Sequence, residues 1–415
     1  MNKERLIDFC QQAAEFSLCA VVFFIPISIA LVNIWLVLFG LFWLMKKIFS
    51  AYSRMPETAA NFFLLALALF SFLSVINTIS MESSAIGIVK IFKNLVLFFA
   101  AVDILNNRRS IKRITWTIIL GLTLLSFDGI FQYVYGKDFI RGYPIHIGLR
   151  YPPTTASVWR IGASMEGGPN DYATYLITLI PMLLSLILYY FKGEKKIIPG
   201  LIGMIAFFCM FNTQYRGAAL GFVLIMLLFG FIKKDVRFVV ILLIFILLLP
   251  FVLPKTLISW ALTHLNPYDF FVEEFGRRWH WYSAMNMIKA HPFIGVGINT
   301  YSINYDHYKM ATDPLSGFYA HNAYLQMAAE IGLLGLFAFL GAVIAIARNW
   351  WKSYKKISEP WLRTVSLGAI GGFTGYLSAS ILESTLHSSN LAVLFWFMAS
   401  LIIAINKLAT KTGGV

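Results

Sequence analysis

Charged residues are scarce in this chain of 415 residues. Asp, Glu, Lys and Arg together make up 13% of it, whereas 59% is hydrophobic. A soluble globular domain is about a quarter charged, so the composition argues against an ordinary soluble fold. Apolar stretches of about 20 residues recur from end to end, and each is long enough to cross a bilayer core as a helix. Because no water satisfies the backbone there, the chain is predicted to be an all-α membrane protein.

Other familiar features are missing too. The three cysteines, Cys10, Cys19 and Cys209, lie in or beside apolar stretches and suggest neither a disulfide nor a metal site. There is no Walker loop, no Cys/His cluster and no Asp-x-Asp pair. The sequence therefore predicts no metal and no cofactor, so the energy for any reaction has to arrive with the substrate. The first apolar stretch lacks a small-residue cleavage pattern and is expected to be retained as a span.

The apolar stretches predict about twelve transmembrane helices in one membrane domain, residues 1–415. No tandem repeat or low-complexity segment divides the chain. The longest polar interval, 254–320, is predicted to be a large loop between the ninth and tenth spans, and loops of this length are usually functional. The predicted spans lie near 15–32, 33–48, 60–78, 88–105, 114–135, 171–191, 197–212, 217–232, 237–253, 322–347, 362–382 and 389–406.

Lysines and arginines predict the orientation of the spans. In short loops these residues mark the cytoplasmic side, and most of the 34 in this chain fall in loops that share one side with both termini. The net charge of +14 is therefore assigned to topology and not to a nucleic-acid partner. The remaining basic residues lie on the outer side, where topology does not require them. They include Lys90, Lys93, Arg160, Arg216, Arg277 and Arg278.

Polar motifs stand where the sixth and eighth spans begin on the outer side. Gly-Gly-Pro-Asn-Asp-Tyr occupies 167–172, where Asn170 or Asp171 could also be an ordinary N-cap. Thr-Gln-Tyr-Arg-Gly-Ala occupies 213–218. A cation at a helix start opposes the macrodipole, so Arg216 is interpreted as part of an anion site together with free backbone N–H groups. The alternative is a side chain that extends to the lipid headgroups.

Two further motifs lie before and at the start of the tenth span. Gly-Arg-Arg-Trp-His-Trp at 276–281 opens a predicted amphipathic helix over 277–290, for which an interfacial position is the alternative. The motif that opens the tenth span itself begins at His321. A neutral imidazole at the mouth of the membrane can accept a proton from a sugar hydroxyl, and the positive end of the helix favours the neutral form. A lone histidine can equally be structural.

These motifs together predict one site. The starts of spans six, eight and ten would converge on the outer face with Arg216 and Arg277, beside the proton acceptor His321. Lys90 and Lys93, at the outer start of the fourth span, would add charge unless they only contact headgroups. The set fits recognition of a pyrophosphate next to a general base, with the pyrophosphate as leaving group.

The sequence at this point resembles the O-antigen ligase family, which shares features with the O-antigen polymerases. The resemblance is carried by Gly-Pro-Asn-Asp-Tyr at 168–172, Tyr-Arg-Gly-Ala at 215–218, Gly-Arg-x-x-x-Trp at 276–281, His-Pro-Phe-x-Gly-x-Gly at 291–297 and His-Asn-x-Tyr-Leu-Gln-x-x-x-Glu-x-Gly-x-x-Gly at 321–335.

The resemblance implies a GT-C-like glycosyltransferase of the bacterial inner membrane with cytoplasmic termini and a periplasmic active site. Such an enzyme moves glycan from undecaprenyl pyrophosphate to lipid A–core, without metal or ATP and with inversion. In that interpretation Arg216 and Arg277 bind the diphosphate, and His321 assists the acceptor hydroxyl. The further substrate-binding residues are predicted to be Arg278, Lys90, Lys93, Arg160, Asn170, Asn322 and Tyr324.

Three other functions remain open from the sequence. An O-antigen polymerase would use the same donor with a lipid-linked glycan as acceptor. A protein O-oligosaccharyltransferase would modify serine on a secreted protein. A transporter would need coupling charges near mid-membrane, for which the candidates are Asp103, Asp128, Glu330 and Glu383.

Overall fold

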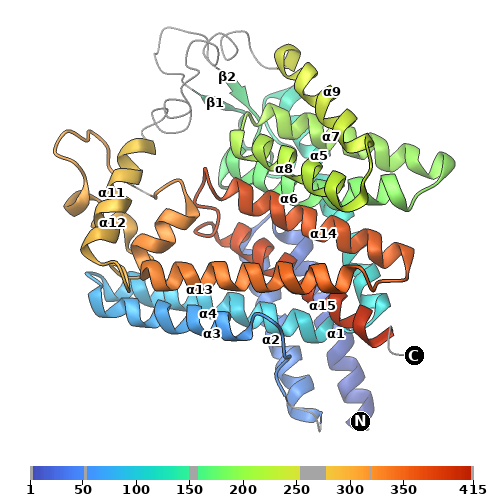
Figure 1. Ribbon diagram of the computed structural model, residues 1–415, viewed down its shortest axis with the longest axis horizontal. Helices are drawn as coiled ribbons and strands as arrows, with labels where there is room; N and C mark the ends of the chain where they lie inside the picture. The colour runs from blue at the N-terminus through green and yellow to red at the C-terminus, as the bar shows by residue number, and fades with distance from the viewer. Residues whose placement is uncertain (1–2, 51–53, 149–157, 253–276, 318, 413–415) are drawn as a thin grey trace.

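Helices make up nearly all of the structure. The computed structural model describes residues 3–50, 54–148, 158–252, 277–317 and 319–412 (Figure 1). Its first half contains α1 Lys3–Phe24, α2 Ile29–Phe49, α3 Asn61–Leu73, the 3-10 helix η1 Ser74–Asn77, α4 Met81–Ile104 and α5 Arg108–Tyr135. The two short strands β1 His146–Gly148 and β2 Val158–Arg160 follow and pair antiparallel.

The second half of the chain is also helical. It contains α6 Gly168–Tyr189, the 3-10 helix η2 Gly193–Lys196, α7 Ile197–Asn212, α8 Arg216–Lys233 and α9 Arg237–Val252. Then come α11 Arg277–Ala290, α12 Tyr301–Tyr308, α13 Ala323–Tyr354, α14 Pro360–Ala379 and α15 Ser389–Thr412. The predicted all-α polytopic membrane fold is confirmed.

A helix is present at each of the twelve predicted spans. Within the described residues, eight helices are long and apolar enough to cross a membrane, so the number of crossings stays a prediction. The first predicted span, 15–32, is wrong at both ends: α1 stops at Phe24, the chain turns through Pro26, and Ser28 caps α2 by accepting from the Leu31 N–H. The fourth span, predicted from 88, begins at Met81 because Ser80 supplies the N-cap.

The core is organised around α15, the most buried of the eight candidate spans. It packs against α4, α13 and α14, while α14 also lies along α6 and α8, and α13 lies along α3 (Figure 1). The outer faces of the helices are apolar and exposed: Phe62 of α3 is 75% exposed and Leu65 is 67% exposed. Exposed large side chains in such number are costly in water and ordinary against lipid tails.

The predicted loop 254–320 contains folded structure. Residues 253–276 and 318 lie outside the described residues. The helix expected over 277–290 is present as α11, and with α12 it forms a cap beside one end of α13 (Figure 1). The side of the membrane on which this cap lies stays a prediction.

The cap is joined to α13 through a break in that helix. Gly332 has φ +74° and ψ 174°, a backbone conformation that essentially only glycine adopts. The break frees the carbonyls of Ala329 and Glu330, which accept the N–H groups of Val296 and Gly297 at 2.9 and 3.0 Å. The motifs at 291–297 and 321–335 therefore form a single structural unit.

Candidate functional site

His321 forms an ion-pair-like contact with a carboxylate. Its Nδ1 lies 2.9 Å from Oε1 of Glu383, which stands in the segment between α14 and α15. Burial alone would raise the pKa of Glu383, but hydrogen bonds from His321 and Asn170 hold it below its ordinary value. The ionised carboxylate can only accept, so Nδ1 of His321 is the donor. In the neutral ring this leaves Nε2 as the proton acceptor.

A hydrogen-bonded chain extends from this pair to an arginine. Asn170 donates from Nδ2 to Glu383 Oε2 at 2.7 Å, and its Oδ1 accepts from the guanidinium of Arg160 at 2.6 Å. Arg160 is fixed further by donating from Nε to the carbonyl of Thr213 at 2.7 Å. The N-cap reading of Asn170 and Asp171 is wrong, because Gly167 caps α6 and no side chain makes the cap bond.

Two more arginines lie beside Arg160. Arg216 is the first residue of α8 and Arg277 is the first described residue of α11. Burial, then the charge of Arg277 and to a smaller extent that of Arg216, lowers the pKa of Arg160. Three arginines and the carboxylate Glu383 therefore lie close enough to interact electrostatically. An anion is the natural further component of such a cluster.

Aromatic rings enclose His321 on its other sides. The ring of Tyr319 meets it edge-on at 5.8 Å between centroids, and the ring of His280 from α11 lies at 5.4 Å. Burial, and then the neighbouring His321, lower the pKa of His280 to about 4. His280 is therefore uncharged at neutral pH and does not add to the positive charge of the site. His321 itself sits at φ +48°, just before the N-cap Asn322 of α13.

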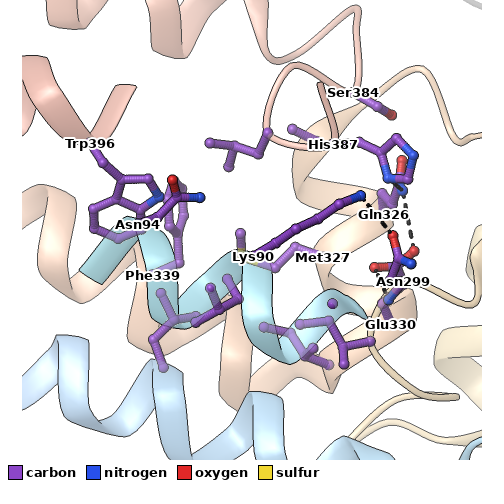
Figure 2. Close-up of a pocket in the computed structure, with 17 residues that line it drawn as sticks. Lys90, Asn94, Asn299, Gln326, Met327, Glu330, Phe339, Ser384, His387 and Trp396 are labelled. Atoms are coloured by element: carbon purple, nitrogen blue, oxygen red, sulfur yellow. Dashed lines mark hydrogen bonds between the residues drawn. The ribbon is translucent and has the colours of Figure 1, made fainter. Parts of the chain in front are cut away.

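A pocket of about 100 Å³ begins next to this pair. It lies between α4, α13 and α15, and Figure 2 shows Lys90 extending across it toward Gln326 and Asn299. Ala323 and Ser384, which line it, are two residues and one residue along the chain from His321 and Glu383. The volume is several times what a single water needs.

The other predicted substrate residues divide between this pocket and structural contacts. Lys90 lies inside α4, more than two turns from its start, and donates to Asn299 at 3.3 Å, whereas Lys93 donates to Asn33 of α2 at 3.2 Å. The expectation that both stand at the outer start of the span is wrong, because α4 begins seven residues earlier than 88.

The remaining three predicted residues contact the protein itself. Asn322 accepts the N–H groups of Tyr324 and Leu325, each at 3.0 Å, as the N-cap of α13. The hydroxyl of Tyr324 donates to the carbonyl of Leu377 at 2.7 Å. The guanidinium of Arg278 lies 4.6 Å from the ring centroid of Trp279. A substrate role for these residues stays a prediction.

Sequence reasoning missed Glu383 as part of this site. The residue was considered only as a coupling charge for transport, since it lies 62 positions from His321. The available signal was weak: an acidic residue directly after a predicted span, on the side to which the basic motifs were assigned. Asn94 carried no signal, because a single amide on an apolar helix is ordinary, and Gln326 entered only as one position of the motif at 321–335.

Comparison with known proteins gives a match to a protein family. The family model described as O-Antigen ligase matches residues 201–340. This range contains all of the motifs that carried the resemblance except Gly-Pro-Asn-Asp-Tyr at 168–172, and the resemblance is thereby confirmed. No curated protein matches the chain.

Proposed function

We propose that this chain, whose residues 201–340 match the family model described as O-Antigen ligase, transfers glycan from undecaprenyl pyrophosphate to lipid A–core. The reaction takes place at the periplasmic end of a GT-C-like bundle in the inner membrane, with both termini in the cytoplasm. The observation that carries the proposal is the chain of hydrogen bonds from Arg160 through Asn170 and Glu383 to His321. It joins an arginine cluster to a proton acceptor.

The arginine cluster suits the donor. A diphosphate carries its charge on several oxygens, and guanidinium groups bind such oxygens with paired N–H donors. Arg216 and Arg277 are the candidates for this role, because both lie close enough to Arg160 to lower its pKa. Neutralising the charge that develops as the diphosphate departs would stabilise the transition state. We propose that no metal is needed for this step.

His321 suits the acceptor. Nε2 of His321 takes the proton of the acceptor hydroxyl while the oxygen attacks the anomeric carbon of the donor. The new carbon–oxygen bond forms as the bond from that carbon to the diphosphate oxygen breaks, so the configuration inverts. Glu383 positions the ring by accepting from Nδ1 and stabilises the imidazolium that forms.

The acidic residues that would serve a transporter have local roles instead. Asp103 accepts from Trp43 and Lys46, and Asp128 accepts two backbone N–H groups of the loop that follows its own helix. Glu330 accepts the N–H groups of Asn299 and Tyr301 at 2.9 and 3.2 Å. These contacts favour an enzyme over a coupled transporter.

The test uses the purified full chain in lipid nanodiscs. It is supplied with undecaprenyl-pyrophosphate-linked glycan and lipid A–core, in the presence of a metal chelator. We expect glycosylated lipid A–core, with an inverted anomeric bond by NMR. In cells, loss of a ligase leaves lipid A–core bare while lipid-linked polymer accumulates. Caps of a single repeat would instead show a polymerase, and retained modification of lipid A–core would contradict both.

A further inference from the structure

We propose that the pocket between α4, α13 and α15 is the acceptor subsite and binds a sugar ring of lipid A–core through neutral hydrogen-bonding groups. The proposal names the partner of His321 and in that sense rests on the proposed function. It is carried by the side chains that line the pocket and by where the pocket opens (Figure 2).

Three of the side chains that line the pocket carry a buried oxygen without a hydrogen-bond partner among the described residues. These oxygens are Oδ1 of Asn94, Oε1 of Gln326 and Oγ of Ser384. Each residue is 5% exposed. A buried polar atom left without a partner costs about 1–3 kcal/mol, so three in one pocket indicate a ligand that supplies the missing donors.

The groups around these oxygens fit hydroxyls better than a second phosphate. Gln326 donates its amide toward Nδ1 of His387 at 3.3 Å. Burial, and then the charge of Lys90, lower the pKa of His387 to about 4, so this ring is neutral at physiological pH. Among the described lining residues Lys90 is the one lysine or arginine and Glu330 is the one carboxylate. Both are already paired: Lys90 donates to Asn299, and Glu330 accepts the N–H groups of Asn299 and Tyr301. Neutral donors and acceptors of mixed direction are what a polyhydroxylated ring pairs with.

The wall opposite His387 is aromatic. Trp396 and Phe339 line this end, and Figure 2 shows the indole of Trp396 beside Asn94. Sugar rings present an apolar face of C–H groups together with hydroxyls at their edge, so an aromatic wall beside an amide matches both parts of the ring.

The pocket is placed for attack on the donor. The ring of Tyr319 lies 5.0 Å from that of His387 and 5.8 Å from that of His321. A saccharide seated against His387 would therefore extend past Tyr319 to His321. Arg160, at the edge of the arginine cluster, is linked to the same histidine through Asn170 and Glu383. Donor and acceptor would meet at His321 from opposite directions.

The test measures binding separately from transfer. De-acylated lipid A–core oligosaccharide is titrated into the full chain in nanodiscs without donor. We expect Asn94→Leu to weaken its binding at least tenfold and Ser384→Ala about threefold, while the thermal stability is kept or raised because an unpaired buried oxygen is removed. Ser378→Ala is the matched control: its hydroxyl is also buried and unpartnered within the described part of the chain, but it does not line the pocket.

The outcomes separate this proposal from the function itself. Oligosaccharide binding that Asn94→Leu removes supports the subsite even when no glycan is transferred. The subsite is overturned if the wild type transfers glycan and the acceptor KM is unchanged in Asn94→Leu and Ser384→Ala. The proposed function is not affected by that result. Absence of oligosaccharide binding to the wild type also overturns the subsite. So does native mass spectrometry that finds a bound phospholipid which Asn94→Leu retains more tightly, because the pocket would then be a lipid site.

Discussion

The two sides of His321 differ in the charge of their polar groups and in how these groups are paired. On the α6 and α8 side the polar groups are charged and bonded to one another: Arg160 contacts both Thr213 and Asn170, and Asn170 contacts Glu383. On the α4 and α13 side they are mostly neutral, and several oxygens are unused within the described residues. The charged side is held in place by hydrogen bonds within the protein, whereas in our proposal the neutral side is completed by a ligand.

The difference follows from what each side has to bind. Guanidinium groups left to move would repel one another and lose orientation, so fixing them by hydrogen bonds in advance lowers the cost of binding a diphosphate. Hydroxyl groups of a sugar can rotate to suit their partners, so a pocket for them needs open donors and acceptors more than rigid ones.

The comparison is tested most directly by removing His321, the group that lies between the two sides. His321→Ala is expected to lower the transfer rate by at least about 10²–10⁴-fold, because the acceptor hydroxyl loses its base. Donor binding and oligosaccharide binding should each persist, and the protein should still insert and fold. Transfer assays alongside thermal unfolding measure this; retention of more than a tenth of the activity would rule out His321 as the base.

The charged side is tested by Arg216→Ala. Losing a hydrogen bond to a charged group is worth about 1.5–3 kcal/mol, so kcat/KM for the donor should fall about 10–150-fold. Arg216→Lys should recover part of this, since a point charge replaces a paired donor. Titration of the oligosaccharide should be unaffected. If Arg216→Ala weakens oligosaccharide binding as strongly as it lowers kcat/KM for the donor, the two sides are not separate.

The next test is Gly332→Ala, at the break in α13 that ends the short segment holding Ala323 and Gln326 of the neutral side. The break in α13 requires a glycine conformation, and an added Cβ would meet the carbonyl of Phe293. We expect a loss of stability of at least about 1–3 kcal/mol. The matched change Gly40→Ala lies in helical α2 with open space around it and should have little effect. Equal thermal unfolding of the two variants would contradict the role given to the break.

The smallest effect is expected for Glu383→Gln, which keeps the shape but removes the charge. Transfer should fall about 10–100-fold with unchanged KM for the donor, because His321 loses its orienting carboxylate. The pKa of Glu383 is lowered in the folded protein. Its stabilising contribution is therefore full above the ordinary carboxyl pKa of 4.5 and is lost as the pH falls through the lowered value.

Unfolding measurements from pH 7 to pH 3 check that sign. Wild type should be more stable than Glu383→Gln at pH 7, and the two curves should converge only at acidic pH. Convergence that begins above pH 6 would show that the carboxylate is not the group responsible.

Much of the fold could be predicted from the sequence, because hydropathy alone locates helices in a chain this apolar. The helix predicted over 277–290 is present with those bounds as α11. The errors came from local chemistry that hydropathy ignores: Pro26 ends a helix inside an apolar run, and Ser80 starts one inside a polar stretch.

The site was predictable only in part. Placing polar motifs at the starts of several spans led to Asn170 and His321, and the basic residues left on the predicted outer side included Arg160. The structure joins all three in one network. Their common partner Glu383 was not predictable in that role, because pairing between α13 and the segment after α14 is a tertiary contact with no local pattern. The docking of 291–297 onto 321–335 was missed for the same reason: both glycine motifs are uninformative until they are seen in contact.

The interrupted helix α13 has a mechanical consequence. The segment between α11 and α12 is bonded to α13 on both sides of Gly332: Ala329 and Glu330 accept from Val296 and Gly297, and the N–H of Leu333 donates to the carbonyl of Pro292. Any tilt of α11 and α12 would therefore be transmitted to α13 at the break, including the short segment that begins beside His321. Movement of the cap would then adjust the position of the proposed base.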